Sequence, residues 1–133
     1  MIDKLLKLHN NSYSPYSNYK VSCIVVMNDG KEFVGVNVEN ASFGATICAE
    51  RSAITSAISN GYKRDDFKEL HVMVSSGKIG TPCFLCRQVI SEFFNENSNI
   101  YCYSTNGEVK EYKVSDLCTH PFGSDDLIWK VAL

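Results

Sequence analysis

The sequence contains no apolar run approaching the roughly 20 residues that an α-helix needs to span a bilayer. Residues 1–5, MIDKL, begin an amphipathic pattern and so lack the apolar core of a secretory signal. An excess of charge of one sign is also missing, because 13 basic and 15 acidic side chains give a net charge of −2. The sequence therefore predicts a cytoplasmic protein with no membrane partner and no positive surface for nucleic acid.

Signs of disorder or of a fibrous architecture are equally absent. Hydrophobic residues make up 44% and charged residues 21% of the 133 positions, both near the averages of globular proteins. There is no internal repeat, linker or low-complexity segment. A chain of this length buries roughly two thirds of its unfolded surface, so it needs no disulfides to fold. We expect one domain over residues 1–133, either a compact enzyme or a binding module.

Apolar spacing and turn residues predict helices and strands in alternation. The helices are predicted at 2–9, 48–60 and 83–95, and the strands at 21–27, 33–38, 70–74, 100–103 and 109–114. The turn signal Asn106-Gly107 leaves no room for a crossover helix, so the fourth and fifth strands should pair antiparallel. The predicted fold class is α/β, with a mixed five-stranded sheet and helices on its faces.

The six cysteines of a chain in a reducing compartment indicate metal ligands, redox chemistry or simple burial. Cys83 and Cys86 form a C-x-x-C pair at the start of a predicted helix, whose dipole favours thiolate over thiol. Alone, this motif fits a metal pair, a thioredoxin-like redox pair or buried apolar cysteines. Cys48 also opens a predicted helix and has Glu50 two residues on, so three sulfurs can face one point.

Three protein ligands are typical of a catalytic zinc site, which leaves its fourth position to water, whereas a structural site uses four. The number of cysteines with ligand spacing here is three. Cys23, Cys102 and Cys118 have no ligand spacing and are predicted to be small buried hydrophobes. Three thiolates overcompensate the charge of a dication, so positive groups must offset them. Arg51 directly follows Glu50, and Arg87 directly follows Cys86, so both are placed to donate hydrogen bonds to the sulfurs. A solvated surface arginine is the alternative for both.

Glu50 also has two interpretations. A glutamate in the first turn of a helix can simply complement the helix dipole. Next to a zinc-activated water, the same carboxylate can hold the water, take its proton and pass it to a substrate nitrogen. The reaction that this second interpretation predicts is the hydrolytic loss of ammonia.

The sequence C-A-E at 48–50, with P-C-x-x-C at 82–86, resembles the zinc nucleoside and nucleobase deaminases. Within that superfamily the chain looks most similar to the small homotetrameric cytidine deaminases. Five segments carry the likeness: YSPYSNY at 13–19, NVENAS at 37–42, CAER at 48–51, CRQVI at 86–90 and FGSDDL at 122–127. The resemblance implies a three-layer α/β/α fold and zinc-dependent deamination of cytidine and deoxycytidine to uridine and deoxyuridine, as in pyrimidine salvage.

The resemblance also implies roles for matching residues. Cys48, Cys83 and Cys86 would hold Zn²⁺, and Glu50 would shuttle protons to N3 and to the leaving amino group. The implied substrate contacts are Asn37 and Glu39 on the ribose 3′-hydroxyl, Tyr19 against the pyrimidine, the backbone of Ala49 and Thr81 on the base edge, and Phe122 reaching a neighbouring subunit's pocket in a homotetramer. A carboxylate at the sugar would repel phosphate, so free nucleosides are the expected substrates.

Two positions depart from the family pattern. Phe84 stands where the family usually has glycine, and Tyr19 where it usually has phenylalanine, so the pocket should differ in size or selectivity. One alternative keeps the chemistry but takes a cytosine-nucleoside antibiotic of the blasticidin S type, against which Glu39 argues. The other is a non-catalytic zinc module, which would need a fourth protein ligand such as Cys102 or Cys118.

Overall fold

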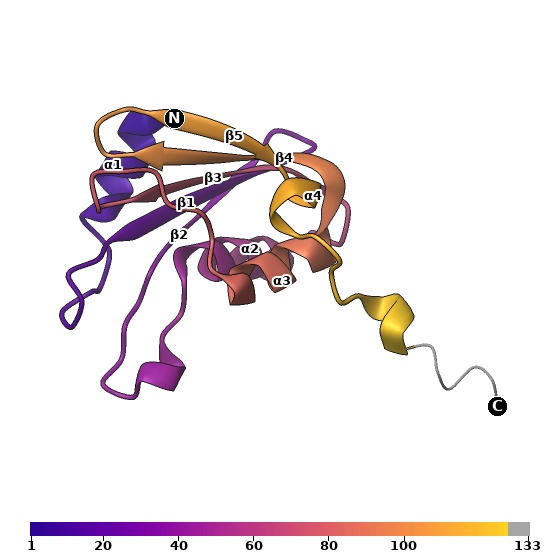
Figure 1. The fold of residues 1–133 in the computed structure, drawn as a ribbon, viewed down its shortest axis with the longest axis horizontal. Coiled ribbons are helices and arrows are strands. Elements are labelled where there is room, and N and C mark those ends of the chain that lie inside the picture. Colours follow the sequence, from indigo (N-terminus) through magenta and orange to yellow (C-terminus); the bar gives the residue numbers. More distant parts are fainter. Residues whose placement is uncertain (128–133) are drawn as a thin grey trace.

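The computed structural model describes residues 1–127, so the last six positions of the predicted domain, 128–133, lie outside the described residues. A mixed five-stranded sheet lies between helices on its two faces (Figure 1). The strands are β1 (Val21–Met27), β2 (Glu32–Val36), β3 (Phe67–Val74), β4 (Phe94–Ser104) and β5 (Val109–Lys113). The helices are α1 (Ile2–His9), α2 (Ala49–Ser59), α3 (Phe84–Phe93) and α4 (Val114–Leu117).

The predicted three-layer α/β/α arrangement is confirmed. In the sheet, with strand order β2-β1-β3-β4-β5, β3 and β4 run parallel and the other neighbours antiparallel. The predicted antiparallel pairing of the fourth and fifth strands is therefore also confirmed. Helix α1 packs on one face through Leu5, which contacts Ile24, Met73 and Tyr103. Helices α2, α3 and α4 cover the opposite face, where the larger core cluster lies.

Several predicted boundaries are wrong. The second strand ends at Val36 and not at 38, and the third strand begins at Phe67 and not at 70. The third helix ends at Phe93 rather than at 95, because Phe94 is extended and already pairs with Phe67 of β3. The polar segment that follows shows no strand pattern, and regular pairing with β3 resumes only at Asn99, which lies opposite Glu69. Val114 belongs to α4 and not to the fifth strand, since the carboxylate of Asp116 accepts a hydrogen bond from the Lys113 backbone N–H at 2.9 Å and caps a new helix.

The helices of the described residues are short. The longest of them, α2, has 11 residues. None of the helices in residues 1–127 combines the length and the apolar character that crossing a membrane requires.

Gly35 of β2 sets how closely α2 approaches the sheet. A Cβ atom at this position would lie 2.4 Å from the carbonyl oxygen of Ala49 and 2.5 Å from the backbone nitrogen of Ala53. Both contacts are with helix backbone, which cannot rotate away as a side chain can. The missing side chain therefore lets the first turns of α2, which follow Cys48 and contain Glu50, lie directly on the sheet.

Gly35→Ala is expected to lower the free energy of unfolding by about 3 kcal/mol or more, because an added methyl group against backbone must displace the whole helix. Chemical denaturation measures this directly. Gly44→Ala is the matched control, since nothing lies within 4 Å of a Cβ there, and it should change stability by less than about 0.5 kcal/mol. Equal stabilities for the two variants would contradict this account of helix packing.

Candidate functional site

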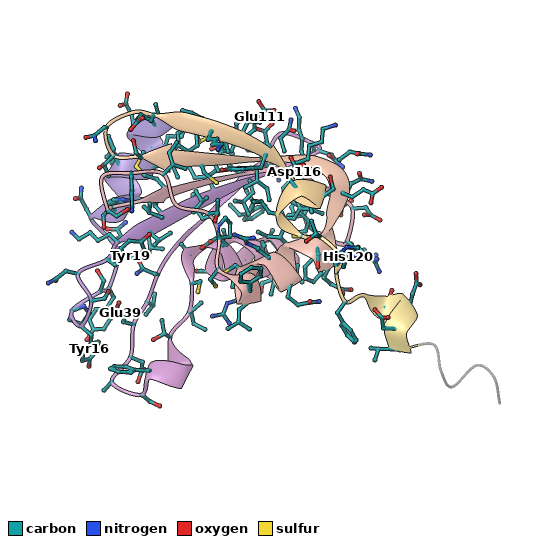
Figure 2. All side chains as sticks on the ribbon, viewed as in Figure 1. Tyr16, Tyr19, Glu39, Glu111, Asp116 and His120 are labelled. Atoms are coloured by element: carbon teal, nitrogen blue, oxygen red, sulfur yellow. The ribbon has the colours of Figure 1, made fainter. Side chains whose placement is uncertain are left out.

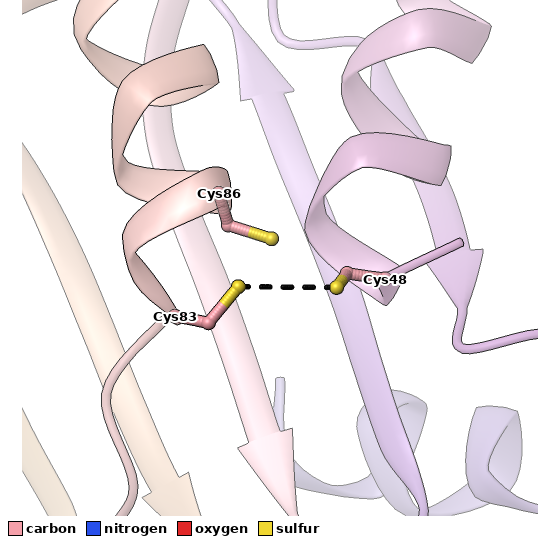
Figure 3. A group of neighbouring side chains, drawn as sticks. All are labelled: Cys48, Cys83 and Cys86. Carbon is pink, nitrogen blue, oxygen red and sulfur yellow. Dashed lines mark hydrogen bonds between the residues drawn. The ribbon is translucent and has the colours of Figure 1, made fainter. Parts of the chain in front are cut away.

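Two helices that begin beside each other bring three cysteine sulfurs together (Figure 3). Cys48 precedes the first turn of α2, Cys83 precedes α3, and Cys86 lies in the first turn of α3. The Sγ atoms of Cys48 and Cys83 are 3.9 Å apart, and all three sulfurs lie within 4.8 Å of one another. Across residues 1–127, no histidine, carboxylate or other cysteine joins this group.

This donor set fits zinc. A tetrahedral zinc ion binds thiolates at about 2.3 Å, which places two sulfurs about 3.8 Å apart, close to the 3.9 Å between Cys48 and Cys83. The two cysteines considered as a fourth ligand lie elsewhere: Cys102 is in the hydrophobic core, and the Cys118 thiol donates to the carbonyl oxygen of Arg87 at 3.4 Å. A set of three protein ligands is typical of a catalytic site with one open position.

Hydrogen bonds concentrate negative charge on Cys48. The thiol of Cys86 and the guanidinium of Arg51 lower the pKa of Cys48 to about 5. Cys86 donates this hydrogen bond and is buried, so its own pKa is raised. The Nη2 atom of Arg51 donates to the Cys48 sulfur at 3.5 Å and to the carbonyl oxygen of Thr46 at 3.3 Å. Arg51 thus lies where it offsets the charge of the sulfurs.

Arg87 does not bind the sulfurs, and the prediction that it donates to them is wrong. Its guanidinium donates to the carbonyl oxygen of Pro82 at 2.7 Å, to Thr81 Oγ1 at 2.8 Å and to the carbonyl oxygen of Leu117 at 3.2 Å. Helical side chains point back toward the helix N-terminus. From its place in α3, Arg87 therefore reaches over the preceding loop instead of inward to Cys48.

Glu50 lies on the second residue of α2 and is 4% exposed. It lines a cavity of about 290 Å³ beside the sulfur cluster. Burial raises the pKa of Glu50 to about 7, and the charge of the Cys48 thiolate adds to the rise. A carboxyl group whose pKa lies near neutrality can both accept and donate a proton, as general acid–base chemistry requires.

The same cavity collects most of the predicted substrate contacts. Its walls include Tyr19, Asn37, Cys48, Ala49, Glu50, Thr81 and Cys83. The sequence analysis missed an apolar side made by Val21, Val72 and Val74, and it also missed Thr46. Strand residues two apart share a face, so the pattern of β3 could have placed Val72 and Val74 together, but not against the cavity.

The ring of Tyr19 lines this cavity, whereas its hydroxyl lies against the loop that follows β3. A Cβ atom on Gly80 would be 3.3 Å from the Tyr19 hydroxyl and 3.1 Å from Cγ2 of Val74. The Ser76 side chain is also within hydrogen-bonding reach of this hydroxyl. The extra oxygen at this departure from the family pattern is thus accommodated by the loop.

The Asn37 side chain connects the segments that form one wall of the cavity. Its Nδ2 atom donates to the carbonyl oxygen of Tyr19 at 2.7 Å. Its Oδ1 atom accepts from the Val21 backbone N–H at 2.9 Å and from the Ser12 hydroxyl at 2.5 Å. Asn37 therefore fixes the chain on either side of Lys20 as well as facing the cavity.

Glu39 lies outside this cavity and lines an adjoining one of about 310 Å³. Figure 2 labels Glu39 and Tyr16, which lines the same adjoining cavity. Thr46 lines both cavities. The Glu39 carboxylate accepts hydrogen bonds from the backbone N–H groups of Tyr16 at 3.0 Å and Ser17 at 3.2 Å, and from the Ser17 hydroxyl. The Ser17 hydroxyl lowers the pKa of Glu39, so this carboxylate is negative at neutral pH.

Phe122 is the one predicted substrate contact that lines neither of these two cavities. Its side chain is 56% exposed, and its carbonyl oxygen accepts a hydrogen bond from Gln88 Nε2 at 2.9 Å. It lies on the C-terminal segment, which extends away from the sheet (Figure 1). Within the described residues Phe122 does not line the cavity of its own chain.

Comparisons with known proteins agree with this arrangement. The family model of the cytidine and deoxycytidylate deaminase zinc-binding region matches residues 1–104. The chain is 34% identical to cytidine deaminase from Mycoplasma genitalium over 122 residues, which are 92% of each protein. It is 35% identical to cytidine deaminase from Sporosarcina psychrophila over 130 residues, which are 95% of this chain and 94% of the relative.

Solved structures of cytidine deaminases are also similar to this chain. A crystal structure of cytidine deaminase from Burkholderia pseudomallei superimposes with a TM-score of 0.87 at 37% identity, covering 91% of this chain and 95% of that one. Cytidine deaminase from Mycobacterium tuberculosis follows with a TM-score of 0.78 at 29% identity, covering 92% and 94%. The resemblance inferred from the motifs is confirmed, and the chain belongs to the cytidine and deoxycytidylate deaminase family.

Proposed function

We propose that this protein hydrolyses cytidine and deoxycytidine to uridine and deoxyuridine with release of ammonia. The observation that carries the proposal is the cavity in which Glu50 lies beside the three sulfurs. Relatives of similar length are named cytidine deaminases, and none of this favours an antibiotic of the blasticidin S type as the substrate. We assign the reaction to one catalytic domain over residues 1–133 and to pyrimidine salvage in the cytoplasm.

Zinc would be held by Cys48, Cys83 and Cys86. When bound, the ion supplies Lewis acidity, which lowers the pKa of water toward neutrality. Arg51, which donates to the Cys48 sulfur, offsets the charge of three thiolates on one dication. The first turns of α2 and α3 add to this effect, because helix N-termini stabilise negative charge.

Glu50 would move the protons of the reaction. Its carboxylate accepts a proton from the attacking water and delivers it to N3 of the pyrimidine, and a second transfer protonates the leaving amino group. The net change consumes one water and one cytidine and yields one uridine and one ammonia. A pKa of about 7 suits this exchange, because the same group must serve as base and then as acid.

Substrate recognition would divide between the two adjoining cavities. The backbone groups of Ala49 and Thr81 face the base edge, and the Tyr19 ring packs on the pyrimidine. Asn37 and Glu39 hold the ribose 3′-hydroxyl, with the sugar near the boundary between the cavities. The negative charge of Glu39 would disfavour a substrate that carries phosphate.

We also propose a homotetramer in which Phe122 enters the pocket of a neighbouring subunit. Several apolar side chains are more than half exposed in the single chain, as an interface requires: Phe43, Phe84, Leu85 and Phe122. A neighbouring subunit would also help to enclose the 290 Å³ cavity, which the single chain leaves partly open. Sedimentation should give four chains per particle, and a fully active monomer would contradict this assembly.

An activity panel tests the function. Purified protein should release ammonia from cytidine and deoxycytidine, and at least about 100-fold more slowly from cytidine 5′-monophosphate, since a negative carboxylate faces the sugar. Blasticidin S serves as the competing substrate. Faster turnover of the antibiotic, or no ammonia from either nucleoside, would overturn the proposal.

A further inference from the structure

We propose that Arg87 is a positioning residue that holds the cavity wall formed by Thr81 and Cys83. This inference rests on the proposed function, because it concerns the wall that would face the pyrimidine. Arg87 does not itself line the cavity. It acts indirectly, through residues 81–83, the peptide that joins the loop after β3 to the start of α3.

The guanidinium of Arg87 donates hydrogen bonds to this short peptide. Thr81 and Cys83 line the cavity, and Pro82 between them is buried. The guanidinium donates to the Pro82 carbonyl oxygen at 2.7 Å and to Thr81 Oγ1 at 2.8 Å. Hydrogen bonds from a charged donor are stronger than neutral ones. Two of them on adjacent residues therefore fix both the path of the loop and the orientation of Thr81.

A third contact ties the loop to a distant segment. The same guanidinium donates to the carbonyl oxygen of Leu117 at the end of α4, at 3.2 Å. The Cys118 thiol donates in return to the backbone oxygen of Arg87. Helix α4 packs into the main hydrophobic core through Val114 and Leu117. Arg87 is thus anchored to the core, and the loop is anchored to Arg87.

Phe84 explains how the guanidinium keeps this orientation at the surface. The Phe84 ring is 78% exposed and lies over the guanidinium, with 4.4 Å between Cζ of Arg87 and the ring centroid. Stacking of this kind is favourable and holds the planar group in place. The large residue at a position where the family usually has glycine is therefore accounted for by its contact with Arg87.

This geometry predicts a defect in substrate binding when Arg87 is replaced. Arg87→Gln should raise KM for cytidine about 10-fold, because the Thr81 wall is no longer held in its binding position. Arg87→Lys should behave similarly, since a single ammonium cannot serve three acceptors in a fixed fork. A purely structural role would lower the fraction of folded enzyme, which reduces apparent kcat and leaves KM unchanged.

Arg64→Gln is the matched control. Arg64 makes an exposed ion pair with Glu92 at 3.8 Å, and pairs of this kind contribute little to stability. The control should keep KM within twofold of the wild-type value. An Arg87→Gln variant whose KM also stays within twofold would overturn the proposal.

A double-mutant cycle tests whether Arg87 acts through Thr81. Thr81→Val removes the acceptor and keeps the shape, and we expect it to raise KM about threefold. Because the two side chains share one hydrogen bond, the double variant should show about the 10-fold effect of Arg87→Gln alone. An effect near the product, about 30-fold, would refute action through Thr81.

Amide hydrogen exchange tests the proposal independently of catalysis. The peptide spanning residues 79–85 should take up deuterium at least about 10-fold faster in Arg87→Gln, and at the wild-type rate in Arg64→Gln. Unchanged exchange in Arg87→Gln would refute the positioning role even in an active enzyme. A wild-type protein that releases no ammonia from cytidine would instead refute the proposed function, and the exchange result would still decide the role of Arg87.

Discussion

Glu50→Gln is expected to lower kcat for cytidine by about 10²- to 10⁴-fold, the range that a positioned proton-transfer group contributes. Glutamine has nearly the same shape, so the buried cavity at the start of α2 should be preserved. The amide cannot take a proton from water or return one to the substrate. Ammonia release at saturating cytidine measures the loss.

Two further measurements assign that loss to chemistry. Zinc per chain should match the wild-type ratio, and uridine should still bind, because the sulfurs and the cavity walls are untouched. Glu96→Gln is the matched control, since Glu96 is exposed on β4, and its kcat should stay within twofold. If Glu50→Gln retained more than a tenth of the wild-type kcat, Glu50 could not be the proton shuttle.

The fold could be predicted wherever a local pattern determines the structure. The turn at Asn106-Gly107 correctly predicted the antiparallel pairing of β4 and β5, because the segment between Ser104 and Val109 is too short for a crossover connection. The extension of β4 back to Phe94 could not be predicted. Residues 95–99 are polar, and β4 pairs with β3 at Phe94 and then again from Asn99 onward, across an irregularity in the register. This pairing depends on a partner strand that is distant in the sequence.

The chemistry of the site could be predicted from the sequence more fully than its shape. A cysteine at the N-terminus of a helix carries its own physical signal, so the sulfur cluster could be anticipated from Cys48, Cys83 and Cys86. The hydrogen bond from Arg87 to Leu117 could not be anticipated, because Leu117 lies 30 positions away in the sequence. The separation of Glu39 from the main cavity is likewise a tertiary result: its backbone donors belong to Tyr16 and Ser17.

The close approach of α2 to the sheet links the fold to the geometry of the site. Gly35 admits the backbone of α2 at distances that no side chain would allow, and that helix follows Cys48 and carries Glu50. The parallel pairing of β3 and β4 places α3 on the same face of the sheet. The two helix starts therefore meet at one edge of the core, which explains why a small fold can assemble three ligands and a buried carboxylate.

Removal of the metal is expected to reduce cytidine turnover below about 1% of the initial rate and to lower Tm. The three sulfurs are held within 4.8 Å of one another, and without a cation the charged Cys48 thiolate loses its main stabilising partner. A ligand present at 1,000 times its Kd stabilises the folded state by about 4 kcal/mol. Dialysis against a chelator, followed by thermal unfolding and an ammonia assay, measures both losses.

Zinc added back should restore activity and Tm together, because the binding of one metal ion accounts for both. Cys83→Ala should lose the metal and most of the activity, whereas Cys118→Ala should retain about one zinc per chain, since the Cys118 thiol contacts the Arg87 carbonyl oxygen and not the cluster. Elemental analysis separates the two variants. Full conversion of cytidine by protein that contains no transition metal would contradict the zinc-dependent mechanism, whatever the effect on Tm.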